Sequence, residues 1–174
     1  VLRRPPFGHK AKSAHDMGRE FRILNQLKDA FPYCPKAYAH CTDTSLIGSE
    51  FYVMERVKGI ILRSDLPREL ALSADDTQGL CQSFIDKLVE LHRVDYAACG
   101  LGELGKPEGY VQRQISGWSD RYEKALTPDA PLWEEVKAWL DAKMPADHPA
   151  PAIVHNDYRF DNVILDPNNP MQII

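Results

Sequence analysis

The feature that most constrains the fold is a polar segment between two short apolar runs near the end of the chain. Ile153 and Val154 precede the segment, and residues 163–165 (Val-Ile-Leu) follow it. Six of the eight residues in between are polar or charged. Short β-branched runs favour buried strands, and the polar segments between them favour surface loops that carry function. We therefore predict a strand, a loop and a strand, with the chemistry on the loop.

The loop contains the pattern H-x-D-x-x-x-x-N, formed by His155, Asp157 and Asn162. The catalytic loop of protein kinases has the same spacing, in which the Asp accepts the substrate hydroxyl proton and the Asn ligates magnesium. By this pattern, Asp157 is a candidate base and the amide oxygen of Asn162 a candidate metal ligand. His155 is better suited to brace the loop backbone than to react. Arg159 is a candidate to meet a transferring phosphate, because planar cations bind phosphate well.

Two other interpretations of the same residues remain open on the pattern alone. His155 and Asp157 could belong to a metal site of two His and one carboxylate, as in H-x-D hydrolases or oxygenases. That site needs a second His, and the 17 residues after Asp157 contain none. Alternatively, Asp161 and Asn162 could simply satisfy backbone groups in a polar turn.

Length and composition are those of an ordinary globular domain. The 174 residues suit one domain, or two small lobes around a cleft. Hydrophobic residues make up 44% and charged residues 26%, a balance that can bury a sizeable core. The net charge of −4 argues against a nucleic-acid partner, which would favour a basic excess.

The cysteines and apolar runs suggest a cytoplasmic protein. The four cysteines form no C-x-x-C pair and no zinc ligand set, which is typical of reduced thiols. No apolar run approaches the ~20 residues that span a membrane, and no secretory signal opens the chain. We expect neither a membrane nor a nucleic-acid partner.

Hydrophobic periodicity predicts both helices and strands. The predicted helices cover residues 13–30, with Ser13 and Asp16 as a capping pattern, and then 78–93, 111–125 and 132–143. The Trp and Tyr residues of the last two helices are expected in the core. The predicted strands cover residues 1–4, 36–42 and 51–57, the last ending at a Gly-bearing connector.

Five segments in order resemble one known family. They are V-L-R at 1–3, R-E-F-R-I-L at 19–24, F-Y-V-M-E-R-V-K-G at 51–59, L-V-E-L-H-R-V-D at 88–95 and H-N-D-Y-R-F-D-N at 155–162. The set resembles the aminoglycoside phosphotransferase and choline kinase-like family. It is most similar to the branch that includes the kinase domains fused to acyl-CoA dehydrogenases. Asn156 stands where this family usually has Gly, and Asn tolerates unusual backbone angles better than most residues.

The resemblance implies a fold and a reaction. The fold is α+β, a partial protein kinase-like two-lobe fold with a β-rich N-lobe at 1–57 and a mainly helical C-lobe at 58–174. The reaction is transfer of the γ-phosphate of ATP, with Mg²⁺, to a hydroxyl of a small molecule. Arg3 would bind the phosphates with Glu20 as its partner. The backbone from Glu55 to Val57 would face adenine, with Met54 packing nearby.

The resemblance also implies that both ends are truncations of a longer protein. The family places a second metal-ligating Asp just beyond the strand that Ile174 occupies, so we expect the chain alone to bind Mg-ATP weakly. A non-catalytic kinase-fold binding module or fused partner domain is the alternative, although the intact H-x-D-x-x-x-x-N pattern argues against it. Within the family, the acceptor could be an aminoglycoside, a choline-like alcohol, a sugar or a hydroxyacyl-CoA.

Overall fold

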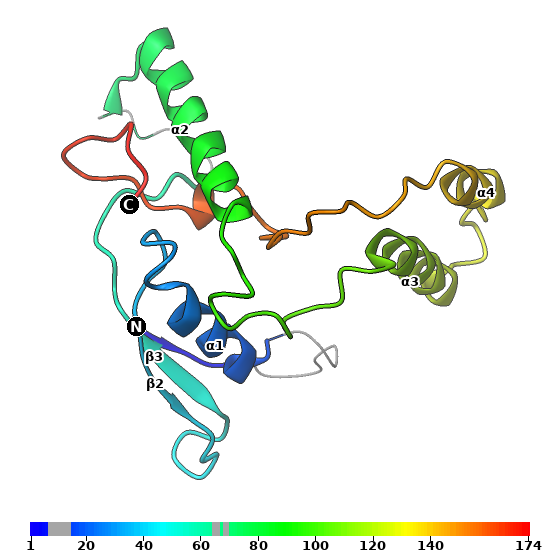
Figure 1. The fold of residues 1–174 in the computed structure, drawn as a ribbon, viewed down its shortest axis with the longest axis horizontal. Coiled ribbons are helices and arrows are strands. Elements are labelled where there is room, and N and C mark those ends of the chain that lie inside the picture. The colour runs from blue at the N-terminus through cyan, green and yellow to red at the C-terminus, as the bar shows by residue number, and fades with distance from the viewer. Residues whose placement is uncertain (7–14, 64–66, 68–69) are drawn as a thin grey trace. The chain divides into compact units, whose positions relative to one another are not determined.

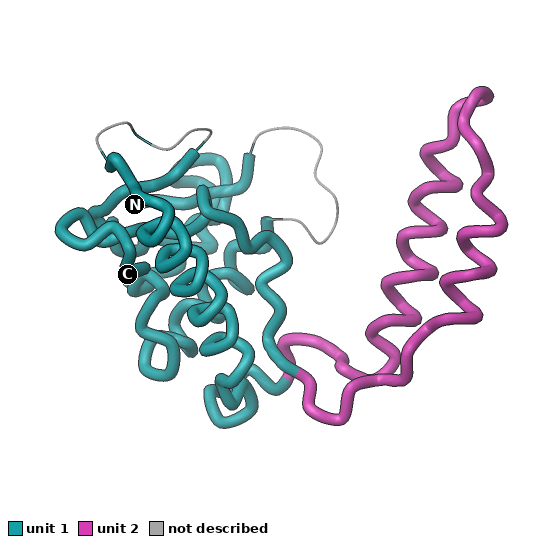
Figure 2. Tube along the Cα trace, turned by 90° about the horizontal axis from the view of Figure 1, so that it is seen from above, with its two compact units in different colours: residues 1–102, 152–174 teal, residues 103–151 magenta. Residues whose placement is uncertain are grey.

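The computed structural model describes residues 1–6, 15–63, 67 and 70–174. Its elements are β1 (Leu2–Arg3), α1 (Met17–Leu27), β2 (Ala37–Cys41), β3 (Phe51–Met54), α2 (Ala74–His92), α3 (Tyr110–Ala125), α4 (Glu134–Ala142) and the 3₁₀ turn η2 (Phe160–Asn162) (Figure 1). The chain divides into two compact units, one formed by residues 1–102 and 152–174 and the other by residues 103–151 (Figure 2). This division by compactness differs from the predicted boundary between lobes at residue 57, which stays a prediction.

A three-stranded antiparallel sheet in the order β1-β3-β2 opens the first unit. All three strands coincide with predicted ones but are shorter than expected. In the register of β1 with β3, Leu2 lies opposite Val53 and Arg3 opposite Tyr52. The sheet therefore places the side chain of Arg3 beside a tyrosine that the sequence pattern did not single out.

Helix α1 packs against β2 and β3. Its N-cap is Asp16, whose carboxylate accepts a hydrogen bond from the backbone N–H of Arg19 at 2.8 Å. The predicted capping residue Ser13 lies outside the described residues. Met17 and Leu27, the first and last residues of the helix, are buried.

Helix α2 begins four residues earlier than its apolar stripe predicts. Ser73 and Asp76 form a capping box, in which each side chain accepts a hydrogen bond from the other residue's backbone N–H. This polar first turn precedes the first buried residue, Leu80, so hydrophobic periodicity alone misses it. Leu80 joins the main apolar cluster, whose other buried members are Leu62, Val163, Leu165 and Ile173.

The predicted strand before the polar loop is wrong, and the strand after it is reduced to a bridge. Ile153 and Val154 adopt no strand conformation, and Val154 is 53% exposed. A strand needs a partner for its backbone groups, and among the described residues these two have none. After the loop, fully buried Leu165 forms isolated bridges with Ile60 and Ile173.

The second unit contains α3 and α4, which pack against each other. Lys137 of α4 binds Glu123 of α3 at 2.7 Å. The prediction that the tryptophans here lie in the core is wrong: Trp118, Trp133 and Trp139 are 56–63% exposed. Two helices have only one shared face, which cannot enclose three indole rings. Within the described residues, no helix has both the length and the apolar character needed to cross a bilayer.

Candidate active site

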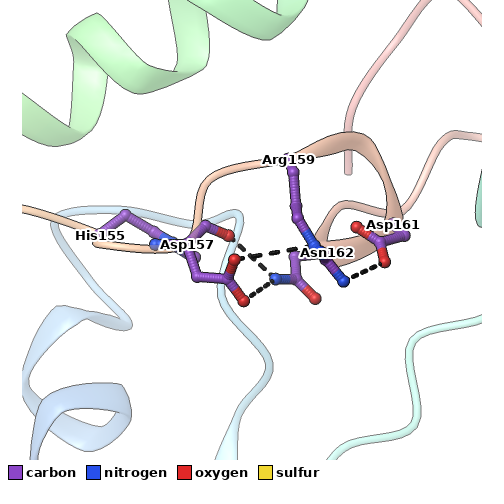
Figure 3. Close-up of polar contacts among 5 residues, drawn as sticks. All are labelled: His155, Asp157, Arg159, Asp161 and Asn162. Atoms are coloured by element: carbon purple, nitrogen blue, oxygen red, sulfur yellow. Dashed lines mark hydrogen bonds and ion pairs between the residues drawn. The ribbon is translucent and has the colours of Figure 1, made fainter. Parts of the chain in front are cut away.

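Asp157 and Asn162, five residues apart, meet in the structure (Figure 3). The side-chain N–H of Asn162 donates to the carboxylate of Asp157 at 2.7 Å and to its carbonyl oxygen at 2.9 Å. The turn η2 makes this possible, because it folds the chain back with Asn162 N–H bonded to the carbonyl of Arg159 at 2.9 Å. The amide oxygen of Asn162 has no hydrogen bond within the described part of the chain, so it is available to a ligand.

His155 braces the backbone at the start of the loop. Its Nδ1 accepts a hydrogen bond from the backbone N–H of Asp157 at 3.3 Å, and its ring meets the edge of Tyr158. Between these residues, Asn156 has a positive φ of 66°. That left-handed backbone is the conformation for which glycine is the usual choice, which accounts for the Asn-for-Gly difference from the family pattern.

Arg159 lies between two carboxylates of the same loop. Its guanidinium binds Asp161 at 2.6 Å and lies 3.7 Å from the carboxylate of Asp157. Its side chain is 63% exposed, so these contacts contribute little to stability. They hold a planar cation beside the candidate base, in reach of solvent.

Aromatic rings anchor the loop on α2. The ring of Phe84 stacks on Tyr158 and Phe160, with centroids 4.1 and 4.2 Å apart. The hydroxyl of Tyr158 donates to the carbonyl oxygen of Phe84 at 2.7 Å. Burial raises the pKa of the Tyr158 hydroxyl. The loop therefore rests on a helix instead of being carried by two strands.

A cavity of about 430 Å³ adjoins the loop, within the size range of small-molecule sites. One side is formed by the end of β3 and the connector after it, Met54 to Val57, and another by His155, Tyr158 and Asn162. Its remaining lining residues are mainly apolar: Val1, Phe31, Tyr33, Pro35, Ile61, Lys87, Leu91, Val163, Ile164, Ile173 and Ile174. The cavity thus joins the predicted adenine-facing segment to the predicted catalytic loop.

The predicted pair of Arg3 and Glu20 is present. Arg3 Nε lies 3.2 Å from Glu20 Oε2, and the same oxygen accepts a hydrogen bond from the hydroxyl of Tyr52 at 3.0 Å. Burial and then the hydrogen bond to Glu20 raise the pKa of Tyr52 to about 12. Neither Arg3 nor Glu20 lines the cavity, and neither do Asp157 and Arg159. Tyr52 thus holds Glu20, a role that no sequence motif indicates.

The donors at the loop suit magnesium better than a transition metal. No cluster of three or more His, Cys, Asp or Glu residues that could hold a metal occurs among the described residues. Mg²⁺ needs only one or two oxygen ligands from the protein, because phosphates and waters supply the rest. The amide oxygen of Asn162 can supply one such ligand.

Comparison with known proteins agrees with these features. The model of the phosphotransferase enzyme family, APH, matches residues 1–174. The chain belongs to this family. Acyl-CoA dehydrogenase family member 11 of Gallus gallus is 35% identical over 167 residues, which are 96% of this chain and 21% of that protein. Family member 10 of Mus musculus is also 35% identical, over 96% of this chain and 15% of its own length.

A solved structure supports the fold. The crystal structure of a Ralstonia eutropha JMP134 protein assigned to the aminoglycoside phosphotransferases superposes with a TM-score of 0.79 at 34% identity. The match covers 90% of this chain and 47% of the other. The predicted α+β, partial kinase-like fold and the predicted family are therefore confirmed. The chain spans only about a fifth of the length of the curated relatives it matches.

Proposed function

We propose that this domain transfers the γ-phosphate of ATP to a hydroxyl of a small molecule, with Mg²⁺ as cofactor. The observation that carries the proposal is the 2.7 Å contact between Asn162 and Asp157 beside the cavity. It brings a carboxylate and an amide to one point, as phosphoryl transfer to a hydroxyl requires. Membership of the phosphotransferase family supports the same reaction class.

The cavity suits the adenine ring. Its lining is mainly apolar, and adenine also needs backbone groups for its ring-edge hydrogen bonds. The backbone groups of Arg56 and Val57 have no hydrogen bonds within the described part of the chain, so their N–H and C=O remain available. Met54, at the end of β3, would pack against the face of the ring.

Asp157 would act as the base. Its side chain is 66% exposed, so an acceptor hydroxyl can reach it from solvent. As the hydroxyl oxygen bonds to the γ-phosphorus, the bond to the bridging oxygen breaks, ADP leaves and the hydroxyl proton passes to Asp157. Asn162 would hold the metal through its amide oxygen, and Mg²⁺, when bound, neutralises charge on the phosphate oxygens.

Two arginines, Arg3 and Arg159, would bind the phosphates of ATP. Arg3, with its side chain 50% exposed and fixed by Glu20, would bind the phosphates of ATP from the sheet. Arg159 would approach the transferring phosphate from the loop. Each arginine already has an anionic partner that holds it in place.

The acceptor is proposed as a hydroxylated small molecule. The names of the relatives point to acyl-CoA chemistry, and that of the structural neighbour to aminoglycosides. A panel of hydroxyacyl-CoAs, aminoglycosides, choline-like alcohols and sugars, each tested for acceptor-dependent release of ADP from Mg-ATP, separates these classes.

Asp157→Asn tests the proposed chemistry in the protein that carries this domain. With the acceptor that stimulates ADP release most, we expect kcat to fall at least roughly 100-fold, because base catalysis is worth this much. Asp166→Asn is the matched control, since Asp166 only caps a turn at Asn168 and Asn169, and it should change kcat less than about twofold. An unchanged rate in Asp157→Asn would contradict the proposal and favour a non-catalytic binding module.

A further inference from the structure

Lys87 of α2 makes an unusual set of contacts at the cavity wall. Its ammonium donates to the hydroxyl of Tyr33 at 2.6 Å and to the carboxylate of Glu90 at 2.6 Å. The same ammonium lies 4.0 Å from the centre of the Tyr33 ring. The side chain is only 16% exposed, and both Lys87 and Tyr33 line the cavity.

The contact joins two walls of the cavity that are distant in sequence. Tyr33 belongs to the segment between α1 and β2, of which Phe31 and Pro35 also line the cavity. Lys87 is 54 residues further along the chain. A cation bound both to the hydroxyl and to the ring face fixes the orientation of that tyrosine as well as its distance.

The same face of α2 carries the candidate catalytic loop. Phe84 lies three residues before Lys87, and residues at this spacing are neighbours on a helix surface. Phe84 stacks on Tyr158 and Phe160 and accepts the hydroxyl hydrogen bond of Tyr158. One turn of α2 therefore binds the loop through Phe84 and the opposite wall through Lys87.

We propose that Lys87 is a positioning residue, which fixes the wall at Tyr33 relative to the loop and thereby sets the affinity of the cavity for its ligand. The identity of that ligand, Mg-ATP, rests on the proposed function. The positioning itself rests on the contacts of Lys87 alone. Neither Tyr33 nor Lys87 belongs to the H-x-D-x-x-x-x-N pattern, so the role is separate from the chemistry assigned to the loop.

Lys137 of α4 provides a matched control. It binds Glu123 at 2.7 Å and Glu134 at 3.1 Å, and its side chain is 18% exposed, close to the value for Lys87. It lies in the second unit and does not line the cavity. If Lys87 acted as a stabilising ion pair alone, neither lysine variant should change the affinity for Mg-ATP.

The test uses the protein that carries this domain and compares Mg-ATP binding by titration calorimetry in Lys87→Met, Lys87→Arg and Lys137→Met. Loss of a charged hydrogen bond and of the ring contact should raise the Kd of Lys87→Met roughly tenfold. Lys87→Arg keeps the charge and the ring contact, and should stay within about threefold of the wild type. Lys137→Met should bind like the wild type. Equal Kd values in all four proteins, or an arginine variant as weak as Lys87→Met, would overturn the proposal.

Hydrogen exchange without nucleotide separates this proposal from the proposed function. In Lys87→Met, we expect faster exchange of the hydrogen-bonded backbone amides of Phe31 and Lys36 and of the amides at residues 155–162, and unchanged exchange in α3 and α4. In Lys137→Met, we expect faster exchange in α3 and α4 and unchanged exchange around the cavity. If the wild type binds no Mg-ATP but this exchange pattern appears, the proposed function fails and the positioning role stands. Unchanged exchange of the Phe31 and Lys36 amides in Lys87→Met would overturn the positioning role, whatever the nucleotide result.

Discussion

At the scale of single residues, the candidate loop depends on one left-handed backbone position, Asn156, with φ of 66°. This conformation turns the chain between His155 and Asp157 so that the backbone N–H of the latter reaches the imidazole. Asn adopts it at modest cost, glycine at almost none, and a β-branched residue only with strain.

We predict opposite outcomes for two substitutions of Asn156. Asn156→Gly should leave the free energy of unfolding within about 0.5 kcal/mol of the wild type, because glycine accepts the positive φ. Asn156→Val should lower it by roughly 1–2 kcal/mol, because the branched side chain clashes in this conformation. Urea denaturation measures both. A valine variant as stable as the glycine variant would contradict the loop geometry.

A second residue-scale prediction concerns Tyr52, whose pKa is raised to about 12 by burial and by Glu20. The folded protein therefore favours the neutral phenol over the phenolate. The stabilisation is fully present below the ordinary tyrosine pKa near 10 and is lost as the pH rises from there through about 12. Between these limits, the wild type should lose on the order of 2 kcal/mol relative to Tyr52→Phe.

The measurement is the free energy of unfolding of both proteins from about pH 9 to pH 12. The phenylalanine variant keeps the ring and lacks the ionisable hydroxyl, so the difference between the two curves isolates Tyr52. A difference that does not change with pH would show that Tyr52 does not hold Glu20 as the structure has it.

At the scale of elements, the polar loop is anchored by a close backbone approach at Gly59. A Cβ at this position would overlap Ile164 and the carbonyl oxygen of Leu165. Ile60, the next residue, pairs with Leu165 through two backbone hydrogen bonds of 2.8 and 2.9 Å. The connector after β3 therefore touches the segment after the loop at a point that admits only glycine.

We predict that Gly59→Ala destabilises the fold by roughly 1–3 kcal/mol, the usual cost of forcing extra volume into a packed site. Gly79→Ala is the matched control: it lies within α2 with nothing near the added methyl, and should stabilise by up to about 1 kcal/mol. The measurement is the Tm of each variant relative to the wild type, from thermal unfolding. Equal shifts in Tm would contradict the close approach.

The sequence predicted helices and strands correctly where their formation depends on residues close together in the chain. Apolar periodicity located each of the α-helices α1 to α4 in the described part of the chain, and the errors lie at their ends. The start of α2 depends on the capping box of Ser73, and the start of α4 is delayed because Trp133 takes a left-handed backbone with φ of 54°. The strand expected at Ile153 and Val154 failed because strand formation depends on a distant partner, which propensity does not describe.

At the scale of the whole molecule, the residues of the candidate site could be predicted from the sequence. The residues that hold its loop and cavity in place could not. The five-residue spacing from Asp157 to Asn162 was sufficient to predict that they meet. The residues that hold the loop and one wall of the cavity in place, Phe84 and Lys87, lie on α2, far along the chain from the segments they contact. The one local signal was a lysine beside the apolar stripe of α2, three residues after Phe84, which by itself is typical of an exposed helix face.

The proposed reaction requires that the cavity and the polar loop form one site for a nucleotide and its metal. ATP titrations of the wild-type protein that carries this domain and of its Asn162→Ala variant, each with and without Mg²⁺, test this most directly. We predict that Mg²⁺ strengthens ATP binding at least roughly tenfold in the wild type, and that Asn162→Ala loses this gain while keeping its affinity without metal. An undiminished effect of Mg²⁺ in Asn162→Ala, or a wild type that binds no ATP, would contradict the account.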